Sequence, residues 1–424
     1  MRVDTRRHMY LYFLLIRIAA LFGHKKARML VNGQKATLAK GREDEWAKVR
    51  GAIWIHAASV GEFEQARTLI EKLKIQNSKF KIVVTFFSPS GFEARKNYDL
   101  ADGVYYLPFA TRSNARKFIR ELQPKMAIFV KYEFWPAYIR ELKKQNIPTY
   151  SICSIFRPNQ YFFRWWGKGQ LGILKRFTHL FVQDEASRQL LAAHGVQNVS
   201  VAGDTRFDRV RQVQQSLLSG TKELTPIAQF AEGAERVIVA GSTWPKDEEM
   251  LMNALNEQEQ KTKLILVPHE LNERHLQYIF NLFQGRYVRF SAIANDQLPP
   301  MSRRNILLHA RVLVIDTMGL LSMIYRFGNV AYIGGGFGAG IHNTIEAAVY
   351  GIPVIFGPKY QHFREAQGLI DAGAAEGIRN DGELEKALKN ALDCYSERGA
   401  KAAEYVLSEL GATDKIYKEI FSNK

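Results

Sequence analysis

Short apolar runs alternate with longer amphipathic stretches along most of the chain. One series follows residue 50, a break comes at Gly203-Asp204, and after a polar connector to about Ala234 the alternation begins again. Such alternation is typical of a parallel sheet with helices on both faces. We therefore predict an α/β fold with two Rossmann-like domains and a cleft between them. The predicted strands are residues 53–56, 81–86, 126–130, 149–153, 180–182 and 199–202 in the first series and 237–240, 264–267, 312–315, 330–333 and 353–356 in the second.

The N-terminus does not follow this alternation. Residues 9–22 are apolar except for Arg17, and basic residues lie on both sides of them. As a helix this stretch would be about 21 Å long, whereas the hydrocarbon core of a membrane is about 30 Å thick. A short helix that lies in or dips into an anionic membrane surface suits both the length and the flanks. The alternative is an amphipathic helix that packs on the protein's own core.

These observations divide the chain into three parts. We predict a membrane-associating segment at 1–30, an N-terminal Rossmann-like domain at 31–205, and a connector with the C-terminal Rossmann-like domain and terminal helices at 206–424.

Composition and charge narrow the class of protein. Of the 424 residues, 46% are hydrophobic and 24% are charged, values of a globular protein that exclude a disordered chain. The net charge of +17 favours an anionic partner. Residues 1–40 carry nine Lys or Arg and one acid, and residues 112–176 carry fourteen and three, so the basic excess lies in the N-terminal half. Two cysteines, Cys153 and Cys394, fit a reducing compartment and exclude a disulfide framework.

The second basic region contains an aromatic run, Tyr161-Phe162-Phe163-Arg164-Trp165-Trp166-Gly167-Lys168. Alternating rings and cations suit a lipid headgroup boundary, a sugar or stacked bases. A buried loop is nearly as good an interpretation, and the two cations favour a surface role slightly.

Candidate ligand-binding residues follow several predicted strands in the C-terminal half. A glycine-rich loop, 334–340, precedes a helix start at 342–348, where backbone N–H groups suit an anion and Glu346 suits a ribose. The loop lacks the Lys-Ser/Thr of a P-loop and the spacing of a dinucleotide fingerprint. Residues 241–244, 268–269 and 316–319 end three other strands, and their convergence on one edge favours a phosphate-containing ligand. For Glu346 alone, a role in complementing a helix dipole is the alternative.

A candidate general base lies in the N-terminal half. Residues 56–62 join the first strand to its helix, and Glu62 stands at the helix start, where a carboxylate that faces the cleft suits proton abstraction. An acid that only stabilises the helix dipole would give the same local pattern.

Taken together, these residues resemble the Kdo transferases of lipopolysaccharide synthesis. The motifs that carry the resemblance are HAASVGE at 56–62, FWP at 134–136, GDTRFD at 203–208, GST at 241–243, DTMG at 316–319 and HNTIEAA at 342–348. The resemblance covers nearly the whole chain and implies a GT-B glycosyltransferase fold. It implies an inverting transfer of 3-deoxy-D-manno-octulosonate (Kdo) from CMP-Kdo to a lipid A precursor of the lipid IVA type.

The resemblance also implies roles for individual residues. Glu62 aligns with the family's proton acceptor, and Arg206 stands where a lysine that stabilises the transition state is usual. We expect the CMP-binding residues to be Ser242, Thr243, Pro268, His269, Met318, Gly319, Leu320, Gly335, Gly336, Asn343, Thr344, Ile345 and Glu346. Ser59, Gly61 and Arg157 are expected on the acceptor side.

Three positions depart from the family's pattern. Lys131 replaces the first acid of E-x-E-x-W-P, and we include it with the catalytic residues. Pro268-His269-Glu270 replaces Pro-Arg-His, so a phosphate-binding arginine is absent there, and Trp244 stands where a histidine is usual.

The expected partners are CMP-Kdo as a substrate, an acylated anionic lipid A precursor and a membrane surface at the cytoplasmic face of the bacterial inner membrane. We expect no metal, because no Asp-x-Asp motif is present, and no other cofactor or nucleic acid. The alternatives are a GT-B enzyme with another nucleotide-sugar donor and a basic nucleic-acid-binding module.

Overall fold

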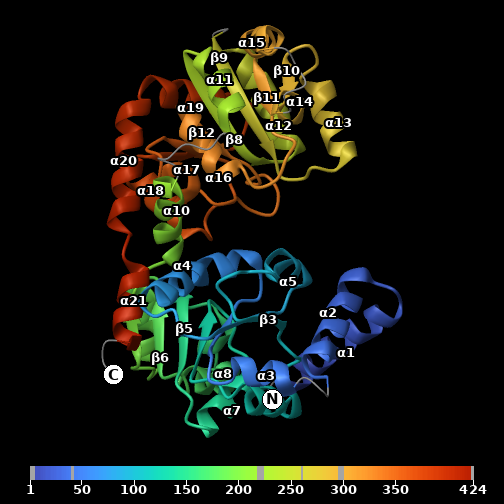
Figure 1. Cartoon of the computed structure of the whole chain (residues 1–424). Helices are drawn as coiled ribbons and strands as arrows, with labels where there is room; N and C mark the ends of the chain where they lie inside the picture. Colours follow the sequence, from blue (N-terminus) through green and yellow to red (C-terminus); the bar gives the residue numbers. More distant parts are fainter. Residues whose placement is uncertain (1–4, 40–42, 217–223, 259–260, 295–299, 422–424) are drawn as a thin grey trace. The chain divides into compact units, whose positions relative to one another are not determined.

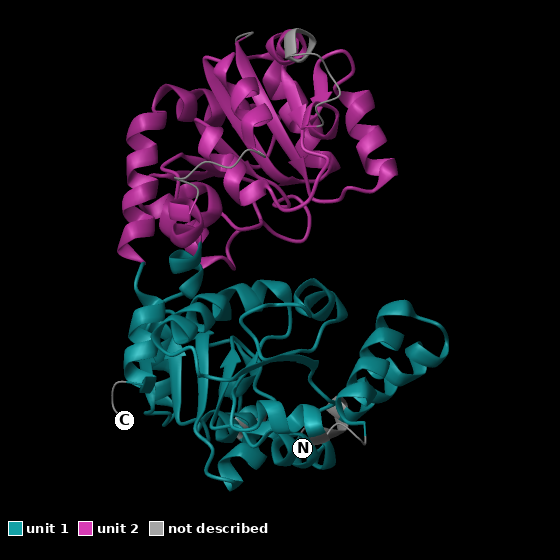
Figure 2. Cartoon of the chain, in the orientation of Figure 1, with its two compact units in different colours: residues 1–209, 410–424 teal, residues 210–409 magenta. Residues whose placement is uncertain are grey.

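The computed structural model describes residues 5–39, 43–216, 224–258, 261–294 and 300–421. The chain forms two compact units, one of residues 1–209 and 410–424 (unit 1) and one of residues 210–409 (unit 2) (Figure 2). Each contains a seven-stranded parallel sheet with helices on both faces (Figure 1). The predicted α/β class with two Rossmann-like domains is confirmed.

The sheet of unit 1 has the strand order β3-β2-β1-β4-β5-β6-β7. Its strands are β1 (Ile53–His56), β2 (Ile82–Phe86), β3 (Gly103–Tyr106), β4 (Met126–Val130), β5 (Thr149–Ser154), β6 (His179–Val182) and β7 (Val199–Val201). Its helices are α1 (Thr5–Leu21), α2 (Lys25–Thr37), α3 (Glu43–Val49), α4 (Val60–Gln76), α5 (Pro89–Arg95), α6 (Arg112–Leu122), α7 (Pro136–Lys144), α8 (Lys168–Leu174), α9 (Glu185–Ala193) and α21 (Ala412–Phe421), with 3-10 turns η1 (Tyr161–Phe163) and η2 (Trp165–Gly167).

The sheet of unit 2 has the order β10-β11-β9-β8-β12-β13-β14. Its strands are β8 (Arg236–Thr243), β9 (Thr262–Pro268), β10 (Tyr287–Arg289), β11 (Val312–Val314), β12 (Val330–Ile333), β13 (Val354–Phe356) and β14 (Ala375–Gly377). Its helices are α11 (Thr225–Glu232), α12 (Pro245–Asn256), α13 (Glu273–Leu282), α14 (Phe290–Ala294), α15 (Pro300–His309), α16 (Leu321–Ile324), α17 (Ile345–Ala348), α18 (Arg364–Asp371), α19 (Asp381–Asp393) and α20 (Tyr395–Ser408), with the turn η5 (Tyr325–Phe327). Helix α10 (Thr205–Ser216) begins in unit 1 and ends in unit 2.

Strand β1 explains why the central strands are continuous apolar runs. Trp54 points to the face covered by α6 and α7, whereas Ile53 and Ile55 point to the face covered by α4. Successive strand residues alternate between faces, so a strand that is buried on both sides needs apolar residues throughout.

The last helix, α21, belongs to unit 1, although the sequence-based boundaries kept it with residues 206–424. Ile416 and Ile420 are buried in the same cluster as α4. The carboxylate of Asp208 accepts the N–H groups of Gly411 and Thr413, each at 2.7 Å, and so satisfies free donors at the start of α21.

The N-terminal segment, predicted as a separate part at 1–30, is also included in unit 1. Phe13 of α1 is buried, with its ring 4.5 Å from that of Phe109 and 6.3 Å from that of Trp135. One side of α1 therefore packs on the protein. No helix within the described residues is long and apolar enough to cross a membrane.

The aromatic run that begins at Tyr161 divides between the core and the surface. Phe162 is buried against Phe134 and Phe156, whereas Tyr161 and Trp165 are 46% and 67% exposed. The side chains of Trp166 and Lys168 lie outside the described ones.

Candidate functional site

Each sheet has a central switch point, where two neighbouring strands are followed by connections that run in opposite directions across the sheet. In unit 1 this position lies between β1 and β4, and in unit 2 it lies between β8 and β12. Ligands of open α/β sheets bind outside the carboxyl ends of the strands at such a switch point. Glu62 and Lys131 follow the two strands of unit 1. The donor-binding candidates lie at the ends of β8 and β12 and of their neighbours β9 and β11, whereas Arg206 follows β7.

Glu62 is held at the start of α4, directly after β1. Ser59 begins the helix by accepting the N–H of Glu62, and the Glu62 carboxylate accepts the N–H of Ala58 at 2.6 Å. Burial raises the pKa of Glu62, and the nearby charge of Glu133 raises it further. The carboxylate therefore has a stronger affinity for a proton than an exposed glutamate has, which suits a general base.

Glu133 follows β4 and faces the end of β1. One of its carboxylate oxygens lies 3.0 Å from His56 Nε2 and 2.6 Å from Trp135 Nε1. The other ring nitrogen of His56 contacts Thr85, at 2.9 Å from Oγ1 and 3.0 Å from the carbonyl oxygen. These contacts fix the anionic group that acts on Glu62, and sequence analysis did not single out His56 or Glu133 for this role.

Lys131 lies at the end of β4 with a left-handed backbone, φ 54°. Its N–H donates to Ile152 and its carbonyl oxygen accepts from Ser154 Oγ, so the strand end is held in this conformation. The charge of Lys131 acts to lower the pKa of Glu62, against the larger effects of burial and Glu133. The departure at this position therefore puts a cation, instead of a second acid, near the candidate base.

Arg206 is bound to a buried carboxylate. Its guanidinium contacts Asp204 Oδ2 at 2.7 and 2.9 Å, and Gln65 of α4 donates to Asp204 Oδ1 at 2.9 Å. Burial opposes ionisation of Asp204, but the charge and hydrogen bonds of Arg206 hold its pKa below the usual value. Asp204 thus joins the candidate cation to the helix that carries Glu62.

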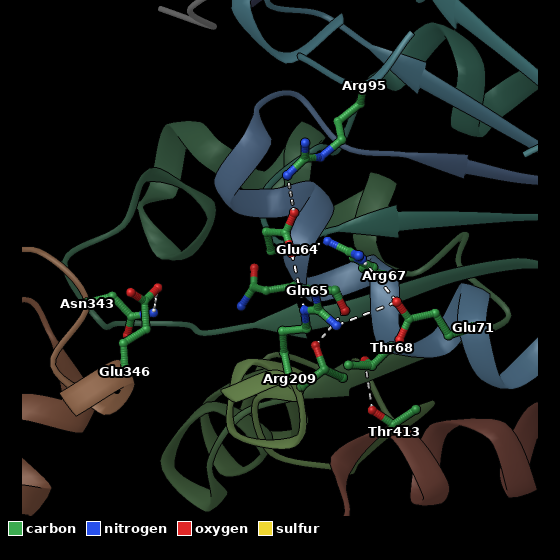
Figure 3. A network of polar contacts seen from close by, with 11 residues as sticks. Glu64, Gln65, Arg67, Thr68, Glu71, Arg95, Arg209, Asn343, Glu346 and Thr413 are labelled. Atoms are coloured by element: carbon green, nitrogen blue, oxygen red, sulfur yellow. Dashed lines mark hydrogen bonds and ion pairs between the residues drawn. The ribbon is translucent and has the colours of Figure 1, made fainter. Parts of the chain in front are cut away.

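A larger charged network covers one side of α4 (Figure 3). Glu64 pairs with Arg95 at 2.8 Å and with Arg67 and Arg209 at 3.5 Å, and Glu71 pairs with Arg67 at 3.0 Å and with Arg209 at 3.5 Å. These pairs tie α4 to α5 and to the start of α10. Arg67 pairs with glutamates three and four residues away on the same helix, whereas Arg95 and Arg209 come from distant parts of the chain, so the sequence alone did not indicate the whole network.

The residues expected on the acceptor side have different surroundings. Ser59 is the N-cap of α4, and a side chain at Gly61 would meet nothing within 4 Å, so the chain is open there. The Arg157 backbone N–H donates to Gln160, and its side chain contacts Tyr132, which follows Lys131.

A separate hollow of unit 1 lies between α1, α2 and the chain after β3. Its volume is about 870 Å³. Three cations line it, Arg17, Arg28 and Lys35, together with apolar side chains such as Val31 and Phe109. Gln34 is buried there and accepts the N–H of Phe109, while its Nε2 atom has no partner among the described residues. The hollow suits a ligand with both anionic and apolar parts.

In unit 2 the ends of the adjacent strands β11, β9, β8 and β12 meet at one edge of the sheet, as predicted from the sequence. Met318 is 82% exposed beyond β11, followed by Gly319 with φ +91° and by Leu320 before α16. Asp316 binds Arg289 and Ser291. Pro268 ends β9, and the next residue, His269, donates its N–H to Thr243 at 3.0 Å.

Two expected donor-binding groups are already occupied within the protein. Thr243 is buried, and its hydroxyl donates to Glu248 at 2.9 Å instead of facing an open site. The Gly335 N–H donates to Asp247 at 3.0 Å. Ser242 beside them has φ 55°, at the point where the register between β8 and β9 shifts.

The glycine-rich loop is required by packing. A Cβ at Gly334 would lie 2.3 Å from the carbonyl oxygen of Ser242, and one at Gly336 would lie 2.5 Å from Gly357. Glycine therefore lets the end of β12 lie directly against β8 and the residue after β13, whereas we expected these glycines to admit an anion.

The segment after the loop leaves polar atoms without partners. Asn343 Nδ2 donates to Glu346 Oε1 at 2.9 Å (Figure 3), but Asn343 Oδ1 and Thr344 Oγ1 are buried and have no hydrogen-bond partner among the described residues. Ile345 is buried and begins α17, which is a single turn. Buried polar atoms normally have a partner, so these two atoms are candidates for contact with a ligand.

No group of three or more His, Cys, Asp or Glu side chains that could hold a metal ion occurs in the part of the chain that the structure describes.

The sequence model of the family described as 3-deoxy-D-manno-octulosonic-acid transferase (kdotransferase) matches residues 25–209. The 3-deoxy-D-manno-octulosonic acid transferase of Rickettsia bellii is 28% identical over 92% of this chain and 90% of its own length. The enzyme of the same name from Rickettsia prowazekii is 27% identical over 87% of this chain and 78% of its own length.

The chain thus resembles the Kdo transferases, at 27–28% identity over most of its length. These matches indicate a glycosyltransferase of lipopolysaccharide synthesis. In structure the chain also resembles the UDP-GlcNAc 2-epimerase of Neisseria meningitidis, with a TM-score of 0.63 at 15% identity over 88% of this chain and 100% of the epimerase. That likeness shows the shared two-domain fold alone.

Proposed function

We propose that the protein transfers Kdo from CMP-Kdo to a hydroxyl group of a lipid A precursor of the lipid IVA type, with inversion at the anomeric carbon. The observation that carries the proposal is Glu62, a carboxylate of raised pKa at the β1–β4 switch point, in a chain that resembles this family. The sheet of unit 2 offers a second switch point for the donor.

In the proposed reaction, Glu62 accepts the proton of the acceptor hydroxyl. The hydroxyl oxygen forms a bond to the anomeric carbon of Kdo while the bond from that carbon to the phosphate oxygen breaks. CMP leaves with the electron pair of the broken bond. Positive groups and N–H donors that are already in place at the developing charge can stabilise such a step strongly.

Asn343 and Glu346 are the proposed ribose ligands. Their mutual hydrogen bond orients both side chains. Asn343 Oδ1 and Thr344 Oγ1, which have no partner within the described part of the chain, offer further contacts to a polar ligand. The leaving group, CMP, carries a single phosphate. We propose that the transfer of Kdo needs no divalent metal. We expect transfer to continue in EDTA, and a loss that magnesium restores would contradict this.

Unit 1 supports an anionic, acylated acceptor. The hollow beside α1 combines Arg17, Arg28 and Lys35 with apolar walls, which suits a phosphate next to an acyl chain. The outer side of α1 is apolar and exposed, including Leu14 at 52% and Leu15 at 55%. We propose that α1 lies on the cytoplasmic face of the bacterial inner membrane, where anionic lipids attract the basic residues nearby.

The test is the release of CMP from CMP-Kdo with and without lipid IVA, together with the mass of the lipid product. We expect release only with the lipid, and a product heavier by Kdo. A binding series with CMP, UMP and GMP tests the donor. Preference for UMP or GMP, or no transfer by a protein that is folded, would overturn the proposal.

A further inference from the structure

Three aromatic rings stack at the carboxyl ends of three adjacent strands in unit 2. Trp244 follows β8, His269 follows β9, and His342 follows the loop after β12. The ring centroids of Trp244 and His269 are 4.7 Å apart with an interplanar angle of 26°, and those of His269 and His342 are 4.5 Å apart at 30°. His269 is thus the middle ring of the stack.

The ring nitrogens of the two histidines are available to a ligand. Within the described residues, neither His269 nor His342 makes a side-chain hydrogen bond, in contrast with His275 of the same unit, which pairs with Glu248 at 3.0 Å. His269 is exposed and His342 is half-buried, so a ligand at the strand ends can reach them.

The charged groups on the surrounding elements are engaged elsewhere. On α12, Asp247 accepts from the Gly335 and Trp244 N–H groups and from Tyr332, and Glu248 binds His275. Glu270 accepts from Asn272, and Lys359 donates to the Gly338 carbonyl. Asp316 binds Arg289 after β11. A protonated histidine in the stack therefore has no described carboxylate of its own.

Two imidazolium rings in contact repel each other, and burial together with His269 lowers the pKa of His342. An anion between or beside the rings favours the protonated form instead, because each protonated nitrogen gains a charged hydrogen-bond acceptor. The indole of Trp244 lies against His269, where its face attracts a cation. Binding of an anion here is therefore coupled to protonation of the pair.

We propose that His269 and His342, stacked on Trp244, bind the phosphate of the nucleotide, and that the pair takes up a proton as the phosphate binds. This inference rests on the proposed function, because it names how the donor phosphate is recognised. The two histidines would then take the role of the phosphate-binding arginine of Pro-Arg-His, which is absent from Pro268-His269-Glu270.

The test uses cytidine 5′-(methyl phosphate), whose diester carries one charge that does not titrate near neutral pH. The second ionisation of CMP itself falls at about pH 6 and would obscure the result. Affinity is measured by calorimetry between pH 5.5 and 8.5, in pairs of buffers with different ionisation enthalpies. We expect uptake of up to one proton on binding, with affinity falling by up to about tenfold for each unit by which pH rises. Cytidine, which lacks the phosphate, should bind with no such dependence.

His269→Gln and His342→Gln should each weaken binding of the methyl ester at pH 6 and remove most of the proton uptake, while affinity for cytidine stays the same. His309→Gln is the matched control, since His309 is exposed and bonds only within its own helix. Unchanged cytidine affinity also shows that a variant is folded.

Two failures can be told apart. If the wild-type protein binds the methyl ester with the same affinity at every pH and without proton uptake, the inference is wrong and the proposed donor stands. If neither CMP nor the methyl ester binds, the proposed function itself is wrong.

Discussion

His56 Nε2 lies 3.0 Å from a carboxylate oxygen of Glu133, although 77 residues separate the two along the chain. The His56 side chain is wholly buried and that of Glu133 is 14% exposed. Because β1 and β4 are neighbours, the histidine at the end of one strand holds the carboxylate that follows the other. The held carboxylate in turn raises the pKa of Glu62, so the pair determines the environment of the candidate base.

Replacing Glu62 tests the base directly. We expect Glu62→Gln to retain CMP binding and thermal stability and to lower turnover about 10²–10⁴-fold, the usual contribution of a general base. Glu121→Gln, which removes a surface carboxylate of unit 1 beside Arg120, is the control and should keep full activity. Turnover near the wild-type value in Glu62→Gln would exclude the assignment.

The pH dependence of transfer should reflect the raised pKa of Glu62. A base acts only when deprotonated, so activity is lost as pH falls through its pKa, and here that loss begins at a higher pH than for an ordinary glutamate.

Glu133→Gln removes a nearby negative charge, which lowers the pKa of Glu62. We therefore expect the acid limb of the kcat profile to move to lower pH in this variant. An acid limb that does not move, in a variant with wild-type stability, would show that Glu133 does not act on the base.

Loss of the Asn343–Glu346 pair should weaken nucleotide binding. We expect Glu346→Ala to reduce CMP affinity by about 1.5–3 kcal/mol, the range for a hydrogen bond to a charged group. Calorimetric titration measures this change, with Glu249→Gln on the exposed side of α12 as the control. Equal CMP affinity in Glu346→Ala and the wild type would remove Glu346 from the donor site.

The two sides of α1 should respond differently to substitution. Leu14→Ser with Leu15→Ser changes the exposed side and should reduce flotation with phosphatidylglycerol vesicles at low salt while thermal stability is kept. Phe13→Ala changes the packed side and should destabilise unit 1 by about 3–5 kcal/mol, because it leaves a cavity beside Phe109. If the double variant floats as the wild type does, the membrane contact lies elsewhere.

Lys263 should stabilise unit 2 although it is a buried cation. It is 3% exposed, and its Nζ donates to the carbonyl oxygens of Leu307 at 2.7 Å and Phe230 at 3.2 Å, near the ends of two helices. Burial lowers the pKa of Lys263. We expect Lys263→Met to leave both carbonyls unpaired and to cost about 1–3 kcal/mol in urea unfolding. Lys261→Met, on the exposed surface, is the control, and equal stability of the two variants would contradict this role.

The pattern of apolar residues was sufficient to place the central strands of both sheets. β1, β2 and β4 are buried along their whole length, so burial on two faces requires an unbroken apolar run. The pattern missed β3, β10 and β14, which all lie at sheet edges. An edge strand contacts the sheet on one side only, and β14, with the sequence Ala-Glu-Gly, contains no apolar run.

Glu62 could be selected from local sequence because a strand, a capping serine and a helix start follow one another along the chain. The raised pKa of Glu62 could not be predicted from local sequence. It depends on Glu133, which His56 holds in place, and the two residues meet only because β1 and β4 are neighbours in the sheet. Local sequence also did not predict that Asp247 accepts the Gly335 N–H, or that Trp244, His269 and His342 form a stack. The local sequence determines which strands are buried and where helices begin. Which charged groups and aromatic rings come into contact depends on the order of distant strands, and that order exists only in the folded sheet.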